Sequence, residues 1–387
     1  MRTSERVQGA APVLFAVPEV TEDDVAAVTE VLRSGWITTG TECAALEDEL
    51  SAHLGGSHVV AVSSCTAALD IGLAHLRLPE GARVGVPAWT FVSTALAAVH
   101  NRLQPVLLDV DPDTLNLSAG ALEAAAPDLD AVVPVHFGGV PVAAEVHAVA
   151  AAAGLPVVED AAHALGAVDG RGPIGGPGAG TVAFSFYATK NLTSGEGGAL
   201  ATSDPGLAAF ARSYRLHGMD ADAWARYRPG ATAGYDVVVP GIKANLPDLL
   251  ATLARSQLRR FDATQARRRA LAERYRAALY GAVEGLRFVP GEADPGSADH
   301  LAVLLLPEGT DRGAVVAAMS AEGIGTSVHF RPLHSFTWFA ETVPVGPGGL
   351  PVCNALAARA LSLPLHVGLS DGDVDRVVDV LLGALAP

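Results

Sequence analysis

The sequence has few cysteines and no long apolar run. Its three cysteines, Cys43, Cys65 and Cys353, lie far apart along 387 residues. That scarcity excludes a disulfide framework and a zinc site, and it favours a reducing, cytoplasmic location. The opening residues MRTSERVQGAAPVLF have no apolar core followed by a cleavage site, so we expect no secretory signal. Because the apolar runs are short and interrupted by glycine, proline and charge, the sequence also predicts no membrane span.

Basic residues are scarce as well. There are 26 of them against 42 acidic residues, which gives a net charge of −16. A surface of this kind excludes nucleic acid and anionic membranes as partners, because both require basic patches. An anionic small substrate stays possible, since a pocket can be locally positive in an acidic protein. Half of the residues are hydrophobic and 18% are charged, so the chain can bury a large core.

Short apolar runs alternate with helical stretches from about residue 58 onward. Seven of the runs are strand-like: His58–Val62, Arg83–Val86, Pro105–Asp109, Ala131–His136, Pro156–Glu159, Thr181–Ser185 and Ala199–Thr202. Runs that are apolar on both faces and separated by helices, such as Thr66–Leu76, are typical of a parallel sheet covered by helices. The sequence therefore predicts an α/β fold whose large domain contains a mainly parallel seven-stranded sheet.

The pattern changes near residue 250. Residues 248–280 predict one or two long helices, and residues 281–387 predict a smaller α/β unit with a strand at Leu301–Leu306 and another near Val328. We therefore divide the chain into a large domain with an N-terminal arm, 1–250, and connecting helices with a small C-terminal domain, 251–387. The arginines expected on a solvated or subunit-facing surface of the long helices are Arg259, Arg260, Arg267, Arg268 and Arg269, with a phosphate-binding role as the alternative.

Lysine is rarer than arginine in this chain. Of the 26 basic residues, Lys190 and Lys243 are the two lysines, which leaves 24 arginines. Lys190 lies in FSFYATKNLTSGEGGAL (184–200), between a strand and a glycine-rich turn, so it should lie at the carboxyl edge of the sheet. A lysine amine can lose its proton when desolvated and form a Schiff base, whereas arginine cannot. A lysine on its own is usually a surface residue, but this position favours a chemical role.

A carboxylate ends the strand before Lys190. In VVEDAAHALGA (157–167) the apolar run stops at Glu159 and Asp160. A helix cap or a metal ligand would be alternatives. An aspartate against the pyridine nitrogen of pyridoxal phosphate (PLP) keeps that nitrogen protonated and strengthens the ring as an electron sink. Asp160 and Lys190, at the ends of successive strands, are compatible with one shared ligand.

A third feature is the strand, small-residue turn and helix of VSSCTAALDIG (62–72). Free N–H groups at the helix start, with the hydroxyl groups of Ser63, Ser64 and Thr66, would form a phosphate site. A capped helix without a ligand is the alternative. Trp89 follows another strand, where it could stack on a flat heterocycle or belong to the core.

Together these motifs resemble those of the DegT/StrS sugar aminotransferases. The resemblance runs in order over nearly the whole chain, through SGWITTG (34–40), SSCTAAL (63–69), DVDPDTLNL (109–117), VEDAAHALGA (158–167), FSFYATKNLTSGEGG (184–198), LHGM (216–219), GIKANLPDLLA (241–251), VHFRPLH (328–334) and LSLPL (361–365). It implies a homodimeric, PLP-dependent enzyme of fold type I. RLHGMDADAWARY (215–227), GIKANL and GIGTSVHFR (323–331) are most similar to the subgroup that forms UDP-4-amino-4-deoxy-L-arabinose, which implies amination at C4.

The resemblance implies a role for each matching residue. Lys190 would carry PLP as a Schiff base and shuttle a proton, Asp160 would hold the pyridinium, and His163 would lie near the phenolic edge of the ring. The other residues implied to bind the cofactor are Thr66, Ala67, Trp89, Ser185 and Asn245, the last from the partner subunit, and those implied to bind substrate are His329 and Arg331. Lys243 lies two residues before Asn245, so it should enter the neighbouring site with it and could meet the diphosphate of the substrate as a point charge. A solvated surface lysine is the alternative. No metal is implied.

The implied reaction moves an amino group from glutamate, or glutamine, through the PLP and PMP forms of the cofactor to the keto group of a nucleotide-linked sugar. One alternative is a PMP-dependent sugar dehydratase, but that branch replaces the lysine with histidine, and this chain keeps Lys190. Another is a non-catalytic PLP-binding regulator, which the intact catalytic positions disfavour. Cys65 and Tyr187 depart from the residues usual at their positions and could alter sugar preference.

Overall fold

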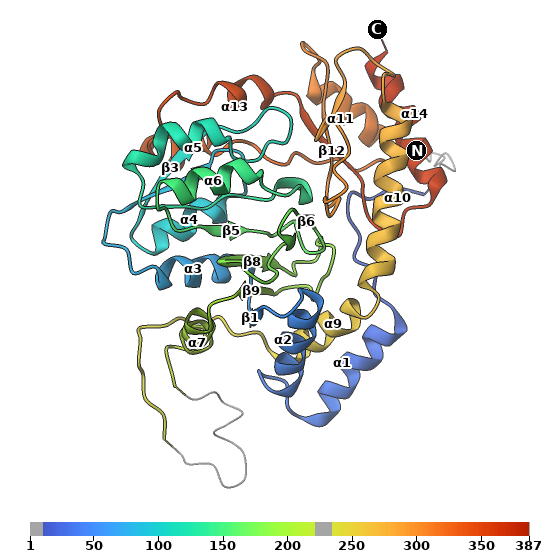
Figure 1. Cartoon of the computed structure of the whole chain (residues 1–387). Coiled ribbons are helices and arrows are strands. Elements are labelled where there is room, and N and C mark those ends of the chain that lie inside the picture. Colours follow the sequence, from blue (N-terminus) through green and yellow to red (C-terminus); the bar gives the residue numbers. More distant parts are fainter. Residues whose placement is uncertain (1–10, 221–233, 387) are drawn as a thin grey trace, which may run out of the picture.

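A central sheet organises the chain in the computed structural model, which describes residues 11–220 and 234–386 (Figure 1). The strands are β1 (His58–Val62), β2 (Arg83–Pro87), β3 (Gln104–Leu108), β4 (Ala131–Val132), β5 (Val158–Asp160), β8 (Thr181–Ser185) and β9 (Gly198–Thr202). Parallel bridges from Val132 to Val157 and from Val135 to Asp160 join β3-β2-β4 to β5-β8-β9-β1. Within this sheet β9 is antiparallel to β8 and β1, and the other pairs are parallel. The predicted mainly parallel seven-stranded sheet is confirmed.

The fourth strand is shorter than predicted. We expected it over Ala131–His136, but β4 ends at Val132. Pro134 has no N–H group and cannot donate to a strand ladder. Beyond β4 the chain stays beside β5 through single bonds, because Asp160 N–H donates to Pro134 O (2.9 Å) and His136 N–H donates to Asp160 O (3.0 Å). These bonds fix the position of Asp160 in the middle of the sheet.

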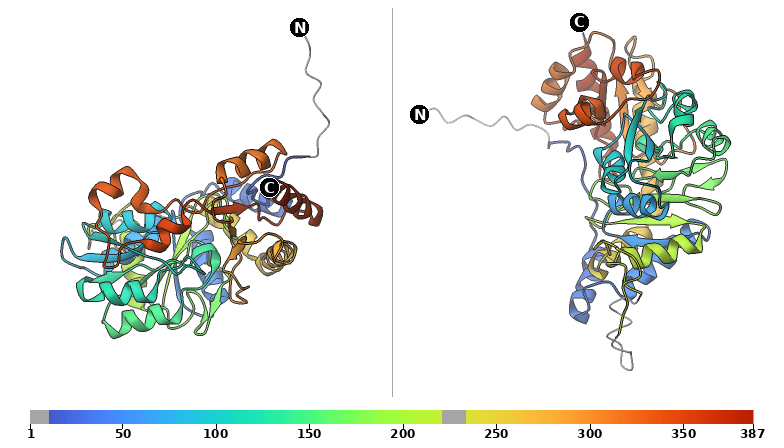
Figure 2. Two further views of the ribbon diagram at one scale, coloured as in Figure 1. Left: turned by 90° about the horizontal axis from the view of Figure 1, so that it is seen from above. Right: turned by 90° about the vertical axis from the view of Figure 1, so that its left-hand side faces the viewer.

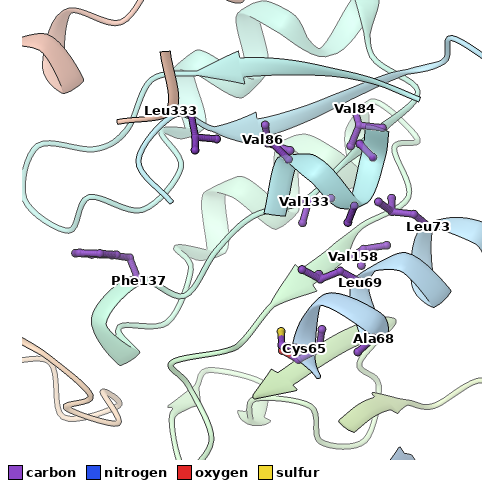
Figure 3. Close-up of a cluster of buried hydrophobic side chains, with 14 of the residues drawn as sticks. Cys65, Ala68, Leu69, Leu73, Val84, Val86, Val133, Phe137, Val158 and Leu333 are labelled. Atoms are coloured by element: carbon purple, nitrogen blue, oxygen red, sulfur yellow. The ribbon is translucent and has the colours of Figure 1, made fainter. Parts of the chain in front are cut away.

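Helices follow most strands of the sheet. They are α3 (Cys65–His75), α4 (Val92–His100), α5 (Ala119–Ala125), α6 (Ala144–Ala152) and α7 (Pro205–Tyr214), with short 3-10 turns at Ala126–Asp128 and Phe137–Gly139. Leu69 of α3 lies in one buried cluster with Val84 and Val158 of the strands (Figure 3). α3 can approach the sheet because Gly72 has no side chain: a Cβ there would lie 2.7 Å from the Thr181 methyl carbon. This packing places the start of α3 at the edge of the sheet.

The N-terminal helices α1 (Glu22–Ser34) and α2 (Thr41–His53) pack on α9 (Asp248–Leu258), which precedes α10 (Phe261–Leu279) (Figure 1). The buried Asp248 carboxylate accepts from the N–H groups of Gly40 (2.7 Å), Cys43 (3.0 Å) and Glu42 (3.2 Å). The first side chain of α9 therefore satisfies backbone donors at the start of α2. The predicted domain boundary after residue 250 falls inside α9 and stays a prediction.

Four of the five arginines predicted to lie on a solvated or subunit-facing surface bond to other parts of the same chain, and Arg267 and Arg269 do so through Leu369 O (2.7 Å) and Ser297 O (3.4 Å). Arg268 is buried and donates to the carbonyl oxygens of Leu365 (2.8 Å) and His300 (3.3 Å). Arg260 pairs with the Asp24 carboxylate at 2.6 Å. The reason is that α10 packs against the C-terminal helix and α9 packs against α1, so this arginine-rich region has protein on more than one side.

The C-terminal part has its own antiparallel sheet, in the order β10-β11-β12. Its elements are β10 (Arg287–Val289), β11 (Ala302–Leu305), α11 (Arg312–Ala321), a 3-10 turn at Leu333–Ser335, α12 (Thr337–Thr342), α13 (Pro351–Leu356), β12 (Ala360–Leu363) and α14 (Asp371–Leu385). The strand predicted near Val328 is not formed; Ser327 makes a single bridge to Ser362. A small hairpin, β6 (Val168–Asp169) and β7 (Gly172–Pro173), lies within the glycine-rich loop after β5.

The C-terminal elements gather at one end of the molecule, and α1 lies at the other (Figures 1 and 2). At the carboxyl ends of the central strands, Phe15 and Ala16 of the N-terminal segment and Leu363 and Leu365 of the C-terminal part line one cavity. In the part of the chain that the structure describes, no helix has the length and hydropathy needed to cross a membrane.

Candidate active site

A cavity of about 610 Å³ lies where β1, β5 and β8 end. Ser64, Cys65 and Thr66 line it after β1, Asp160 lines it at the end of β5, and Ser185 lines it at the end of β8. The carboxyl ends of parallel strands meet at one edge of a sheet, which is where ligands of such folds collect. Of the predicted site residues, the structure brings together Lys190, Asp160, His163, Thr66, Ser185 and His329.

Lys190 lies in the loop after β8, where its N–H group donates to Tyr187 O (2.9 Å). Burial lowers the pKa of Lys190 to about 8, although nearby Cys65 and Asp160 raise it. An amine with this pKa is partly neutral near physiological pH, and the neutral form is the nucleophile. The cavity therefore contains an activated amine.

Asp160 is held by donors on both oxygens. Thr94 donates to Oδ2 (2.7 Å) and Ala162 N–H donates to Oδ1 (3.1 Å). Because the Thr94 hydrogen goes to the carboxylate, the buried Thr90 hydroxyl group, 2.8 Å away, must donate to Thr94. Sequence reasoning missed this pair, although the spacing of the two threonines in WTFVST (89–94) would place them one helical turn apart.

The start of α3 has the features of a phosphate site. The hydroxyl-bearing Thr66 and Ser185 line the cavity there. Gly198 makes room for this turn, because a Cβ at that position would lie 2.6 Å from Cys65 N. The free N–H groups of a helix start attract anions. The N–H group of Ala67, however, already donates to Ser64 Oγ (3.1 Å), and Ala67 does not line the cavity.

Histidines form one wall of the cavity. His163 accepts a hydrogen bond from Gly138 N–H (3.2 Å), and its ring centroid lies 4.4 Å from that of His300. His329 lies 2.9 Å from Ser362 Oγ through Nδ1, and burial, with the charge of Lys190, lowers its pKa to about 4. Sequence reasoning missed His300, which precedes β11 and has no distinguishing motif.

Trp89 does not line the cavity. Its side chain is fully buried, and its indole N–H donates to His329 O (3.2 Å). In this position Trp89 supports the histidine wall, and the predicted stacking on a ligand has no support from its placement. Phe91, two residues later, is 56% exposed and does line the cavity.

Three further predicted residues lie outside the cavity lining. Arg331 is exposed and donates through Nε to Ser335 Oγ (2.8 Å). Asn245 donates to Thr39 Oγ1 (2.6 Å), and the exposed Lys243 ammonium group donates to Asn245 Oδ1. Among the described residues, Lys190 is therefore the one lysine or arginine that lines the cavity.

Two predictions are still to be compared with the structure, one about metal binding and one about the motif RLHGMDADAWARY (215–227). In residues 11–220 and 234–386 no group of three His, Cys, Asp or Glu side chains is placed to hold a metal ion. Residues 221–227 of the predicted motif RLHGMDADAWARY lie outside the described residues.

Comparison with known proteins gives consistent matches. Residues 18–382 match the profile of the DegT/DnrJ/EryC1/StrS aminotransferase family. The spore coat polysaccharide biosynthesis protein SpsC of Bacillus subtilis (strain 168) is 41% identical over 376 residues, 95% of each chain. The sugar aminotransferase CalS13 from Micromonospora echinospora has 28% identity and a TM-score of 0.85 over 96% of this chain and 99% of its own. The structure of Spr1654 from Streptococcus pneumoniae in its PLP form has 28% identity and a TM-score of 0.86 over 97% of this chain and 98% of its own.

Proposed function

The chain belongs to the DegT/DnrJ/EryC1/StrS aminotransferase family, and from that premise we propose that it transfers an amino group from glutamate to the C4 keto group of a nucleotide-linked sugar. It is a PLP-dependent aminotransferase with fold type I. The observation that carries the proposal is one cavity that combines the Lys190 amine, the Asp160 carboxylate and the start of α3. The cysteines are free and buried, which supports the proposal of a cytoplasmic enzyme.

The residues of the cavity fit PLP. When bound, PLP supplies an electron sink for the carbon that loses or gains the amino group. We propose that Lys190 holds the cofactor and moves the proton, and that Asp160 keeps its pyridine nitrogen protonated. Thr66, Ser185 and the start of α3 would bind its phosphate, and the donor set described above supports this assignment.

A mass assay tests the proposed reaction. The enzyme is incubated with PLP, glutamate and a panel of UDP-, dTDP- and GDP-linked 4-keto and 3-keto sugars, and the amino sugars are detected by mass. We expect amination of a 4-keto member. Efficient amination of free keto acids or free keto sugars, with no gain from the nucleotide, would overturn the substrate class. The subgroup that forms UDP-4-amino-4-deoxy-L-arabinose stays part of this proposal.

We also propose that the enzyme is a homodimer with shared sites. Two residues that line the cavity, Phe91 and Tyr187, are 56% and 48% exposed. Exposed aromatic side chains at this wall could be covered by an apolar surface of a partner subunit. Asn245 does not line the cavity of its own chain. Its proposed role is to contact the cofactor phosphate of the partner subunit.

Mixed dimers should reveal this sharing. Lys190→Ala and Asn245→Ala homodimers are each expected to be impaired, the second about 10-fold through loss of a phosphate contact. In the mixed dimer one site collects both changes and the other has neither, so activity should reappear after subunit exchange. Lys190→Ala mixed with wild type is the control for exchange. If verified mixed dimers gain no activity, Asn245 acts within its own chain.

Lys243→Ala should weaken binding of the sugar nucleotide. Both substrates are anionic, but the sugar nucleotide alone has a diphosphate, and an ammonium group binds phosphate as a point charge. We expect a KM for the sugar nucleotide that is about 10- to 150-fold higher, with little change in the glutamate half-reaction. Lys243→Arg, which keeps the charge, is the matched control. Equal effects on both half-reactions, or none, would rule out the diphosphate contact.

A further inference from the structure

Two imidazole rings stand side by side in the cavity. The ring centroids of His163 and His300 are 4.4 Å apart, with 35° between the ring planes. Burial lowers the pKa of both rings well below the usual value, and the charge of Lys190 lowers both further. Both rings are therefore neutral, so each carries one N–H donor and one lone-pair acceptor.

The backbone determines which nitrogen of His300 carries the hydrogen. The Asn191 amide nitrogen donates to Ala298 O (2.8 Å), and a backbone carbonyl can only accept. This fixes the orientation of the Asn191 amide, so its oxygen is the atom that lies 2.9 Å from His300 Nδ1. His300 Nδ1 must donate this bond. The other ring nitrogen, Nε2, therefore has a lone pair and no hydrogen.

His163 has the opposite tautomer. Gly138 N–H can only donate, and it donates to His163 Nδ1 (3.2 Å). The hydrogen of the neutral ring is therefore on Nε2. Both rings line the cavity, but they differ at Nε2. The Nε2 atom of His163 carries a hydrogen and can donate, whereas the Nε2 atom of His300 has a lone pair and can accept.

The two proposed substrates respond differently to a fixed acceptor. The carboxylates of glutamate cannot donate a hydrogen bond, so a lone pair next to them is unfavourable, and its one donor, the α-ammonium group, is the group that is transferred in the proposed reaction. A sugar carries hydroxyl groups, which can donate. Because Nδ1–H is engaged with Asn191, His300 cannot turn into the other neutral tautomer without losing that bond.

We propose that His300 is a specificity-determining residue whose Nε2 accepts a hydrogen bond from a hydroxyl group of the keto sugar. This proposal rests on the proposed function and deepens it. The ring of His300 also bonds to Asn191, the residue that follows Lys190, and so helps to position the Lys190 loop. The experiment must therefore separate the sugar contact from support of the Lys190 loop.

Two substitutions separate these contacts. His300→Asn places an amide near the Nδ1 position, so it can keep the bond to Asn191 while the Nε2 acceptor is lost. His300→Gln reaches the Nε2 position, offers an acceptor there and loses the Nδ1 donor. The two half-reactions of each holoenzyme are followed separately: glutamate removes the visible absorbance of bound PLP, and a nucleotide-linked 4-keto sugar that the wild type aminates restores it.

We expect His300→Asn to slow the sugar half-reaction about 10-fold at subsaturating sugar, the effect of one hydrogen bond. The glutamate half-reaction should change less than about twofold, and His300→Gln should retain most of the sugar rate. Equal slowing of both half-reactions, or no slowing of the sugar step, overturns the proposal. A wild type that reacts with glutamate and with no sugar nucleotide contradicts the proposed function itself, and the His300 proposal with it.

Nitrogen-15 NMR of histidine-labelled holoenzyme tests the same proposal without turnover. The signals of His300 are assigned as those missing from the His300→Gln spectrum. They should show hydrogen on Nδ1 and none on Nε2. A His300 ring with hydrogen on Nε2 would overturn the proposal whatever the kinetics.

Discussion

Lys190→Ala is expected to abolish transamination while the chain stays folded. Lys190 is the one lysine or arginine among the described cavity-lining residues, and burial lowers its pKa to about 8. The substitution removes both the group that holds the cofactor and the group that moves the proton. The loss should therefore exceed the 10²- to 10⁴-fold typical of one acid–base group. Steady-state rates with glutamate and the sugar nucleotide measure it, and circular dichroism checks the fold.

The second lysine makes the control simple. Lys243→Ala should keep the visible absorbance of bound PLP, whereas Lys190→Ala should lose it. Lys190→Arg should be as inactive as alanine, because a guanidinium group keeps its proton. Borohydride reduction of the wild type should place the cofactor mass on the peptide with Lys190. A tenth of the wild-type rate in Lys190→Ala would show that another residue holds the cofactor.

Asp160→Asn should reduce kcat about 10²- to 10³-fold, as expected when one preorganised electrostatic contact is removed. The amide keeps the size of the side chain, and its oxygen can still accept from Thr94, which bonds Asp160 at 2.7 Å. What is lost is the negative charge that keeps the pyridine nitrogen protonated. The value of kcat measures the effect on the reaction, and the rate at which PLP dissociates measures the separate effect on cofactor binding.

The neighbouring carboxylate is the matched control. Glu159 precedes Asp160 on β5, and successive side chains of a strand point to opposite faces. It bonds to His136 (3.0 Å), outside the cavity. Burial would raise the pKa of Glu159, but His136 and the nearby charges of His147 and Arg171 hold it at about 2. Glu159→Gln should therefore lower the thermal midpoint and leave kcat nearly unchanged. A similar fall of kcat in both variants would contradict the role of Asp160.

The sheet and the residues at its strand ends could be predicted because local pattern determines them. Lys190 and Asp160 come at or after the ends of short apolar runs, a pattern typical of buried strands, and parallel strands bring their ends together. His300 could not be predicted, since it reaches the cavity through tertiary contacts, the bond from its N–H group to Gly138 O (2.9 Å) and the bond of its ring to Asn191. Its histidine has no periodic or motif signal.

The direction of individual side chains was the second feature that could not be predicted from the sequence. Trp89 and Phe91 are two residues apart after β2, but the chain has left the regular strand there, so alternation no longer says which side chain faces the cavity. The structure buries Trp89 and leaves Phe91 at the cavity. Arg331 likewise lies in the predicted motif but turns toward Ser335, a neighbour four residues away that offers local acceptors.

The contact made by the Asp248 carboxylate affects when the N-terminal helices can pack while the chain is being synthesised. It bonds to the N–H group of Cys43, 205 residues earlier. A ribosome adding roughly 5–20 residues per second needs about 10 to 40 s to make that stretch. During this time α1 and α2 have left the ribosome without α9, on which they pack. The first helices to be made thus cannot complete their packing until α9 has been made, and chaperones have that interval in which to bind them.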